Sequence, residues 1–486
     1  MNSTHLHHGR PAASGLEPEA IQGFRAILQG QLIEPRDGGY DAARQVWNAM
    51  IDRRPALIAR CASVADVQAA VAFARRQGLP LAVRGGGHNV AGSAICDDGL
   101  VVDLSAMKGL RIDPDRRIAR AEPGLTWGEF DNQTQAHGLA LTGGIHSTTG
   151  IAGFTLGGGF GWLARKHGLS CDNLLSADVV TADGEFCRAS PTENADLFWG
   201  LRGGGGNFGI VTAFEFQLHP LGPVLGGMLL YPLAQAPAVL RFYRDYVAQA
   251  PDELFTIVSL RTAPNIAGVP ASLNSAPVLS LMLCYSGDVA AGERLLKPLR
   301  SFGPPAADLL RVMPYTELQS LFDGSNPPGL RNYWTAEYIR GYEDEAIDLL
   351  CEQVARKTSP MSKVLIAHLQ GAISRAGPEA GAYVHREAPF LANINATWTD
   401  PQEDERHLAW ARALWASLQP FSQGGTYVSF LSNESDERVR AAYDEPTYQR
   451  LVVLKTKYDP GNFFHFNQNI RPAPRPGASA NPAPRP

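Results

Sequence analysis

The chain has 486 residues, of which 44% are hydrophobic, and its formal net charge is −5 at pH 7. This length exceeds the usual limit of a single hydrophobic core, so two domains are expected. The mild negative charge and the lack of a basic stripe with interleaved aromatic residues give no support for a nucleic-acid partner. The sequence has no apolar run of about 18 residues, which argues against a membrane span.

The two ends of the sequence are expected to be disordered. Residues 1–15 lack the apolar stretch of a secretory signal, which favours a cytoplasmic location. Residues 473–486 are rich in proline and alanine and contain no core-forming residues. The six cysteines form no CxxC pair, so neither a zinc site nor a dithiol redox motif is indicated, and no metal is expected.

The first hundred residues predict a strand–helix–strand unit. After a helical and then irregular stretch over 17–45, Ala56–Arg60 is expected to form a strand. Ser63 is a candidate N-cap for a helix that ends at Gly78, and Leu79–Val83 then forms the second strand. This strand leads into a glycine-rich loop, and open α/β sheets commonly bind ligands at such strand ends.

The glycine-rich loop reads Arg84-Gly85-Gly86-Gly87-His88-Asn89. Three successive glycines let several backbone N–H groups converge on one anion. A nucleophilic imidazole follows directly, which suggests a phosphate-bearing cofactor with a reactive atom near His88. The alternatives are a tight turn and a capping or core histidine.

Two further glycine-rich segments follow in the first half of the chain. Residues 143–161 are expected to form one long binding loop, and residues 202–212 lead into a strand over 213–218. Shorter elements lie before and between them. We expect strands over 100–104 and 117–121 and an amphipathic helix over 127–138.

The composition changes near Pro220–Pro223, after which glycine is less frequent. The second half predicts an antiparallel sheet covered by helices, hence an α+β fold overall. Strands are expected over 228–231, 255–260, 278–285 and 393–396, and helices over 236–250, 290–302, 343–358 and 404–418. The aromatic and amide-rich segment 458–470 is expected to be ordered.

Several enzyme classes lack their motifs here. The sequence contains no Gly-Lys-Ser/Thr of a P-loop, no HExxH and no GxSxG, and it fits the Rossmann fingerprint poorly. Three glycine loops together with an amide-rich C-terminal segment are what a dinucleotide of flavin size requires.

Four segments in order carry a family resemblance: RGGGHN, TGIAGFTLGGGFGWLARKHGLSCDNL, RGGGGNFGIVT and KYDPGNFFHFNQNI. With them, the chain resembles the berberine-bridge-enzyme-like oxidases of the vanillyl-alcohol-oxidase superfamily from about residue 45 to 472. The resemblance implies a PCMH-type FAD-binding domain over 16–222 and an α/β substrate-binding domain over 223–425. It also implies that segment 426–472 returns to the FAD-binding domain.

The resemblance also implies roles for individual residues. His88 matches the histidine that is bonded to the flavin 8α-methyl group. The other positions that match cofactor contacts are Arg84, Gly85, Gly86, Gly87, Asn89, Gly144, Ser147, Thr148, Gly150, Gly153, Gly157, Gly158, Gly209, Ile210, Val211, Asn467 and Gln468.

Two departures from the family pattern bear on the chemistry. His146 stands where many members carry a second, flavin-bonded cysteine, so we expect a single covalent link through His88; a link through His146 would need unusual chemistry. Phe430 replaces the tyrosine that many members use as the base. The base is then Tyr427 or a residue of the second domain such as Tyr338 or His385, although each of these is also explained by simple packing.

The expected function is FAD-dependent oxidation of a C–H bond next to oxygen or nitrogen in a small organic molecule (an alcohol, a sugar or a secondary metabolite). Hydride would pass to flavin N5, and O₂ or another acceptor would take the electrons. Thr149, nearly isosteric with the valine of many oxygen-reactive members, is compatible with O₂. The alternatives are a flavin dehydrogenase or oxygenating enzyme on the same scaffold and a non-catalytic flavin-binding protein.

Overall fold

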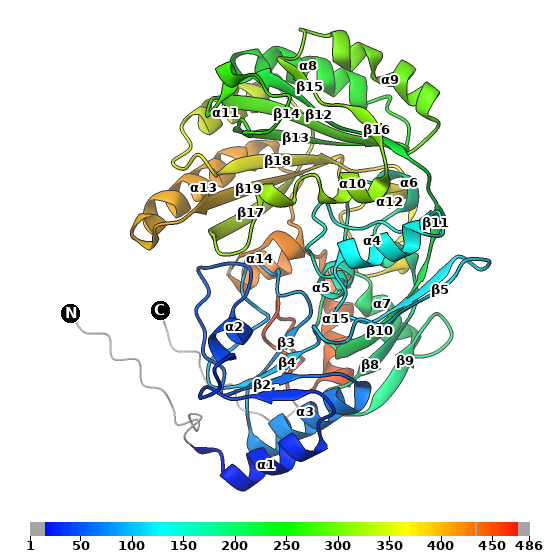
Figure 1. The fold of residues 1–486 in the computed structure, drawn as a ribbon, viewed down its shortest axis with the longest axis vertical. Coiled ribbons are helices and arrows are strands. Elements are labelled where there is room, and N and C mark those ends of the chain that lie inside the picture. Colours follow the sequence, from blue (N-terminus) through cyan, green and yellow to red (C-terminus); the bar gives the residue numbers. More distant parts are fainter. Residues whose placement is uncertain (1–14, 433–434, 475–486) are drawn as a thin grey trace.

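The computed structural model describes residues 15–432 and 435–474 (Figure 1). The expected N-terminal leader and C-terminal tail lie outside the described residues, apart from Gly15, Ala473 and Pro474. Within the described ranges, no helix has the length and apolar character needed to cross a membrane.

A four-stranded sheet at one end of the molecule carries the first glycine loop. Its strands run in the order β1-β2-β4-β3, with β2 and β3 both parallel to β4. Helix α3 connects β2 to β3; it begins at a Ser63 cap and ends at Gly78, whose φ of 65° is left-handed. The predicted strand–helix–strand unit is therefore confirmed. The bounds are β1 (Gln31–Ile33), β2 (Leu57–Arg60), β3 (Leu81–Arg84), β4 (Leu100–Asp103), α1 (Pro18–Ile27), α2 (Tyr40–Arg44) and α3 (Val64–Gln77).

An antiparallel five-stranded sheet in the order β5-β6-β10-β8-β9 continues this half. Helix α4 begins in a capping box in which the Thr126 and Glu129 side chains bond each other's backbone N–H groups. The strands and helices of this part of the chain are β5 (Leu110–Asp113), β6 (Ile118–Ala121), β7 (Leu139–Ala140), β8 (Leu174–Val180), β9 (Phe186–Ala189), β10 (Ile210–Gln217), β11 (His219–Pro220), α4 (Trp127–Gln135), α6 (Ala164–His167) and α7 (Ala195–Leu201).

The expectation of one continuous loop over 143–161 is wrong in its centre. Residues Ile151–Leu156 form a short helix, α5, which buries Ile151, Ala152 and Leu156. The flanking glycines obscure this helix in the sequence, because its apolar side chains fill less than two turns. The segments on either side of α5 are irregular, as predicted.

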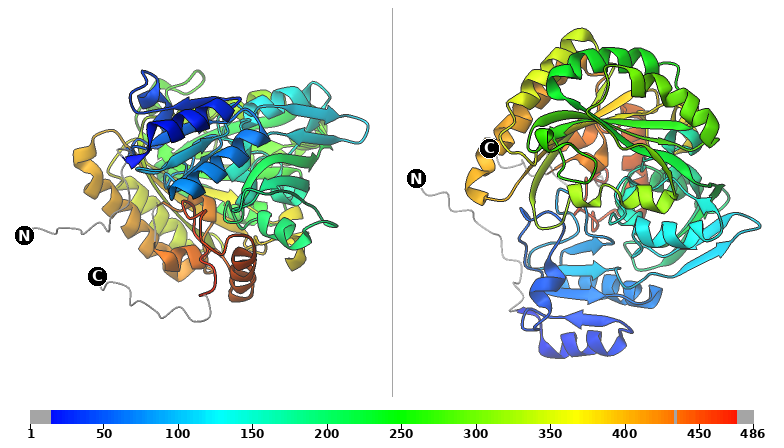
Figure 2. Two further views of the ribbon diagram at one scale, coloured as in Figure 1. Left: turned by 90° about the horizontal axis from the view of Figure 1, so that it is seen from below. Right: turned by 45° about the horizontal axis from the view of Figure 1, so that its top comes forward.

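The second half forms an eight-stranded antiparallel sheet in the order β15-β12-β14-β13-β18-β19-β17, with β16 beside β12. Figures 1 and 2 show α8, α9, α11 and α13 covering its outer face, which confirms the predicted architecture. Its strands are β12 (Val224–Pro232), β13 (Leu254–Thr262), β14 (Pro277–Tyr285), β15 (Ala307–Asp308), β16 (Arg311–Met313), β17 (Arg331–Ile339), β18 (Lys363–His368) and β19 (Phe390–Trp398). Its helices are α8 (Ala236–Val247), α9 (Val289–Ser301), α10 (Tyr315–Ser320), α11 (Asp344–Ala355), α12 (Ala372–Arg375) and α13 (Asp404–Leu418).

The alternation of side chains along these strands separates two hydrophobic layers. In β14, Leu279, Leu281 and Leu283 pack under the helices, whereas Met282 and Cys284 face the glycine-rich half. The inner face of the sheet is therefore the one that meets the glycine loops.

The C-terminal segment runs back along the glycine-rich half through α14 (Asp436–Arg440) and α15 (Glu445–Tyr458). The buried Lys455 ammonium pairs with Asp459 at 2.6 Å and donates to the Asn207 carbonyl at 2.8 Å. The Asn207 side chain accepts the Ile470 N–H at 3.0 Å. These contacts bind the C-terminal segment to the third glycine loop, and Figure 1 shows α15 beside β8 and β10.

Candidate functional site

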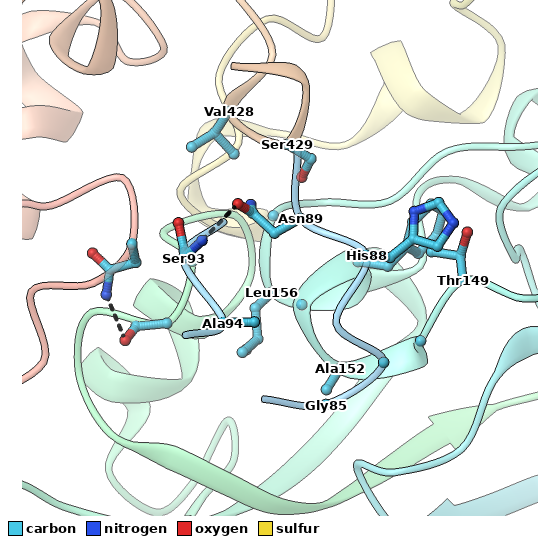
Figure 3. A pocket seen from close by; sticks show the side chains of 18 of the residues that line it. Gly85, His88, Asn89, Ser93, Ala94, Thr149, Ala152, Leu156, Val428 and Ser429 are labelled. Atoms are coloured by element: carbon cyan, nitrogen blue, oxygen red, sulfur yellow. Dashed lines mark hydrogen bonds between the residues drawn. The ribbon is translucent and has the colours of Figure 1, made fainter. Parts of the chain in front are cut away.

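A cleft runs between the glycine loops and the inner face of the eight-stranded sheet. All three glycine loops contribute to it, together with the C-terminal segment. Figure 3 shows the first loop at Gly85–Asn89, with Ala152 and Leu156 of α5 and with Val428 and Ser429 around the same space. Its lining includes Gly85–Asn89, Gly144–His146, Thr149, Gly150, Gly153, Gly157, Gly205–Asn207, Gly209–Val211, Ile257, Trp334, Leu365, Ala367, Leu391, Asn393, Tyr427–Phe430, Phe464, Asn467 and Gln468.

The first two glycine loops touch through their backbones. A Cβ added to Gly86 would lie 2.7 Å from both the N and the Cα of Gly150, and a Cβ on Gly150 would lie 2.6 Å from the Gly86 N. Only glycine permits this approach. Gly87 has a φ of 67°, so the loop also turns through a left-handed conformation just before His88. At this contact the cleft is therefore lined by backbone atoms with no side chains.

His88 follows that turn, and its Nε2 atom is buried without a hydrogen-bond partner. Its ring stacks on Trp47, with centroids 4.7 Å apart and planes 17° from parallel. Burial lowers the pKa of His88 to about 4. The imidazole is therefore neutral at pH 7, which is the nucleophilic form, and Trp47 holds its orientation.

His146 lies in the same cleft but is held differently. Its Nε2 is 2.9 Å from the Asn326 amide nitrogen, and its buried Nδ1 has no hydrogen-bond partner. Asp323 is the acid beside it, with Oδ1 3.9 Å from Nδ1. Burial, with a smaller contribution from Lys363, lowers the pKa of His146 to about 3, so this ring is also neutral.

Most of the sequence-predicted cofactor contacts line the cleft, and four do not. Arg84 is directed away: its guanidinium donates to the Ala43 carbonyl at 2.6 Å and to Asp103 at 3.1 Å. The Ser147 N–H donates to Asp323 at 2.8 Å, and Thr148 is exposed. Gly158, with a φ of 115°, lies against Tyr383.

The three candidate bases are not equivalent. Tyr427 lines the cleft, and its hydroxyl oxygen accepts the Gly159 N–H at 3.0 Å. Burial nevertheless raises the pKa of Tyr427 to about 12. Tyr338 and His385 are outside the lining. The Tyr338 hydroxyl is 2.8 Å from that of Tyr383, and its ring lies 4.6 Å from the His385 ring.

Burial also acts on these two side chains. It raises the pKa of Tyr338 well above the ordinary value and lowers that of His385. Neither tyrosine is therefore a ready base at neutral pH, and His385 is neutral but lies outside the lining. No group of three or more His, Cys, Asp or Glu side chains in the described ranges is arranged to hold a metal ion.

Sequence reasoning missed Leu365, Ala367 and Leu391 of the large sheet, whereas the strand expected over 393–396, a candidate floor of the substrate cavity, does supply Asn393. Leu365 and Ala367 of β18, and Leu391 and Asn393 of β19, line the cleft from alternate positions. The signal for them is the period of two along each strand, but neither strand's pairing partner can be read from its own sequence.

Comparison with known proteins gives two family matches and full-length relatives. Residues 55–190 match the FAD binding domain family, and residues 426–471 match the berberine and berberine-like family. The chain is 32% identical over 455 residues to (R)-6-hydroxynicotine oxidase of Paenarthrobacter nicotinovorans, covering 92% of this chain and 97% of that protein. An FAD-linked oxidoreductase of Dictyostelium discoideum is 30% identical over 430 residues, covering 88% of this chain and 91% of that one.

The chain belongs to the berberine-bridge-enzyme-like FAD-linked oxidoreductases. Its fold agrees with this: a crystal structure of 6-hydroxy-D-nicotine oxidase from Arthrobacter nicotinovorans superposes with a TM-score of 0.84 at 31% identity, over 92% of this chain and 98% of that one. This FAD-linked oxidoreductase has residues that fit the cofactor. Gly86 and Gly150 line the cleft with backbone and no side chain, and His88, whose buried Nε2 has no hydrogen-bond partner, lines the same cleft.

Proposed function

We propose that the chain is an oxidase that carries FAD covalently through His88 alone and oxidises a C–H bond next to oxygen or nitrogen in a small organic molecule. The observation that carries this proposal is the buried, unpartnered Nε2 of His88 at the end of the glycine loop. FAD, when bound, supplies the redox chemistry: it accepts hydride from the substrate and passes electrons to O₂.

His88 is suited to a single covalent link. Its imidazole is neutral, and stacking on Trp47 fixes it. His146 is less suited, because its Nε2 is already engaged by Asn326. These differences support one tether through His88.

The remaining cofactor contacts come mainly from backbone. Gly85–Asn89 and Gly150–Gly157 would hold the pyrophosphate and one face of the flavin through N–H groups. Gly209–Val211 would meet the adenosine end, and Asn467 and Gln468 would supply amides near the ring. Arg84 would act indirectly, by bonding the Ala43 carbonyl and Asp103 and so holding the first loop in place. Ser147, Thr148 and Gly158 would shape the second loop without direct contact.

The substrate would bind between the flavin wall and the inner face of the sheet. Tyr427 is the candidate base with access to this space: once deprotonated, with the Gly159 N–H bonded to its phenolate oxygen, it would accept the proton of the substrate's O–H or N–H as the C–H bond is oxidised. Phe160, Phe430 and Leu391 line the same space and would keep water out. Tyr338, packed on His385, would support Tyr427 through Tyr383, whose hydroxyl it bonds and whose ring lies against Tyr427.

Acid precipitation tests the tether. The yellow colour of the purified protein is expected to stay in the pellet, and to do so for His146→Ala as well. His88→Ala is expected to release all of its colour to the supernatant. Circular dichroism of each variant separates loss of the link from loss of the fold. Acid-stable colour in a folded His88→Ala protein would refute the single link.

Oxygen consumption separates an oxidase from a dehydrogenase on the same scaffold. With any substrate that bleaches the flavin, an oxidase is expected to consume one O₂ and release one hydrogen peroxide per substrate oxidised. Bleaching that persists in air, with turnover only when an artificial acceptor is added, would assign the chain to the dehydrogenases instead.

A further inference from the structure

The inner face of the large sheet carries unpaired positive charge beside the cleft. Leu365 and Ala367 of β18 line the cleft, so alternation places Lys363 on the same face. Lys363 pairs in register with Asn395 of β19, and Asn395 pairs with the cleft-lining Trp334. Arg261 is on the same face of β13, four residues after the cleft-lining Ile257.

Lys363 has no acidic partner. Its side chain is 3% exposed, and its ammonium donates to the Ser325 carbonyl at 2.9 Å and to the Asn326 side-chain oxygen at 2.6 Å. Neither acceptor carries a charge. No ion pair in the described ranges involves Lys363 or Arg261, and the Arg261 side chain donates to the neighbouring Thr262 carbonyl at 3.2 Å. Burying cations without a counter-ion is costly, and proteins rarely do so.

A third basic side chain, Lys357, lies at the end of β13, where it donates to the Thr262 side chain next to Arg261 in sequence. Lys357 also lies close enough to Arg261 to feel its charge, and burial together with that charge lowers the pKa of Lys357 to about 8. Burial and Arg261 hold the pKa of Lys363 well below its ordinary value. A bound anion would reverse both effects by stabilising the charged amines.

Lys363 also sets the tautomer of His146. An ammonium can only donate, so the Asn326 atom that it contacts is the oxygen, and the amide nitrogen faces His146 Nε2. In the neutral His146 ring, Nε2 is therefore the hydrogen-bond acceptor, and the proton is on Nδ1. His146 lines the cleft, and its buried Nδ1–H makes no hydrogen bond, with Asp323 Oδ1 3.9 Å from that nitrogen.

Other buried polar atoms on this face also lack partners. Both amide atoms of Asn395, the side-chain oxygen of Asn393 and the Trp334 Nε1–H are unsatisfied. Asn395 is 0% exposed and Asn393 is 3% exposed. Buried polar groups are normally hydrogen-bonded, so two unpartnered donors, Asn395 Nδ2 and Trp334 Nε1, beside positive charge indicate a missing ligand with acceptor atoms, and the two unpartnered amide oxygens leave room for a donor on the same ligand.

We propose that His146, Arg261, Lys363 and Asn395, here called the cationic corner, bind the carboxylate of the substrate. The substrate class would then be hydroxylated organic acids, with the Asn393 oxygen accepting from a neighbouring hydroxyl. This inference rests on the proposed function, and it selects among its possible substrates. Neutral alcohols and cationic amines would be disfavoured, the latter by repulsion from Arg261 and Lys363.

The affinity of small ligands for the oxidised, FAD-containing protein tests the cationic corner without any turnover. The probes are mandelate and mandelamide, which have the same shape but differ in charge, with affinities measured by calorimetry and by the change in flavin absorbance. Mandelate is expected to bind at least about tenfold more tightly, as expected for one charge-assisted contact. Equal affinities for the two probes would overturn the proposal.

Two variants assign the preference to these residues. Asn326→Asp supplies a carboxylate of nearly the same shape beside Lys363, and it is expected to abolish the preference for mandelate while raising the thermal midpoint. Lys363→Met is expected to abolish the preference too. Lys297→Met, at an exposed position on α9, is the matched control and should keep it. A preference that survives Asn326→Asp in a folded protein contradicts the assignment.

Turnover then distinguishes failure of this inference from failure of the proposed function. Matched pairs of hydroxy acids and their amides are screened for bleaching of the flavin. Bleaching by the acids alone supports both proposals. Bleaching by the amides alone keeps the oxidase and refutes the cationic corner, whereas tight mandelate binding without bleaching by any compound keeps the corner and refutes the oxidase.

Discussion

The two walls of the cleft offer a ligand different chemistry. The glycine-loop wall presents backbone, and its closest contact joins Gly86 to Gly150 with no side chain between them. The sheet wall presents side chains at every second residue of several strands, among them Leu365, Leu391 and Asn393. Backbone is the same in every sequence, so the first wall suits a cofactor shared by a whole family. The second wall can change residue by residue, so under the proposed function it would select the substrate.

The largest expected effect comes from placing one methyl group on the backbone wall. Gly86→Ala puts a Cβ 2.7 Å from the Gly150 backbone, which must move. We expect the protein to lose its bound FAD and about 1–3 kcal/mol of stability, as for other overpacked sites. The flavin-to-protein absorbance ratio and thermal unfolding measure both.

Gly23→Ala is the control for this change, because nothing lies within 4 Å of that position in α1. It should be neutral or slightly stabilising. Full FAD occupancy in Gly86→Ala would show that the two loops do not form a rigid cradle.

A smaller effect is expected where the C-terminal segment enters the cleft. Tyr427→Phe removes the hydroxyl proposed to accept the substrate's proton, so the rate of flavin reduction should fall about 100-fold, in the range of a lost acid–base group. Covalent FAD should remain. Stopped-flow absorbance with a bleaching substrate measures the rate.

Tyr231→Phe serves as the comparison for Tyr427→Phe, because Tyr231 is buried on the helix-covered side of the sheet and bonds the Leu299 carbonyl. It should lose some stability and no activity. If Tyr427→Phe reduces the flavin at an unchanged rate, the proton passes to another group.

The smallest effect on activity is expected at the contact between the two halves, where the change is one of stability with pH. Asp131 of α4 accepts from Gln319 of α10 at 2.8 Å, and burial raises its pKa to about 8. The native state therefore binds this proton more tightly than the unfolded state, and the free energy of unfolding should fall by up to about 1.4 kcal/mol per pH unit between pH 5 and 8. Asp131→Asn should flatten this dependence in thermal midpoints taken across that range. If the thermal midpoints of the two proteins change with pH in parallel, Asp131 is not the cause of the pH dependence.

The sequence predicts the backbone wall better than the sheet wall. Glycine runs are local signals, so the loops around His88, Gly150 and Gly209 were predictable, as were the position of the first loop after a strand and that of the third before one. Helix α5 was hidden because its six residues bury too few apolar side chains to show a period. The residues of the sheet wall depend on which strands pair: Lys363 can be assigned to the cationic corner only because β18 places it beside Asn395 of β19.

The candidate base illustrates the same limit. Tyr427 could be placed near the cleft by resemblance, but its raised pKa and its bond from Gly159 depend on packing against a loop 268 residues away. Residue type and domain alone suggest Tyr338 and His385, and the structure places both outside the lining of the cleft.

The most direct test of the single tether is a tryptic map of the native protein. His88 lies in the peptide 85–108 and His146 in the peptide 121–165, so mass spectrometry separates the two sites. The account predicts one flavin adduct, on the peptide with His88, and an unmodified peptide with His146. An adduct on the His146 peptide, or none on the His88 peptide of protein that contains FAD, would contradict it.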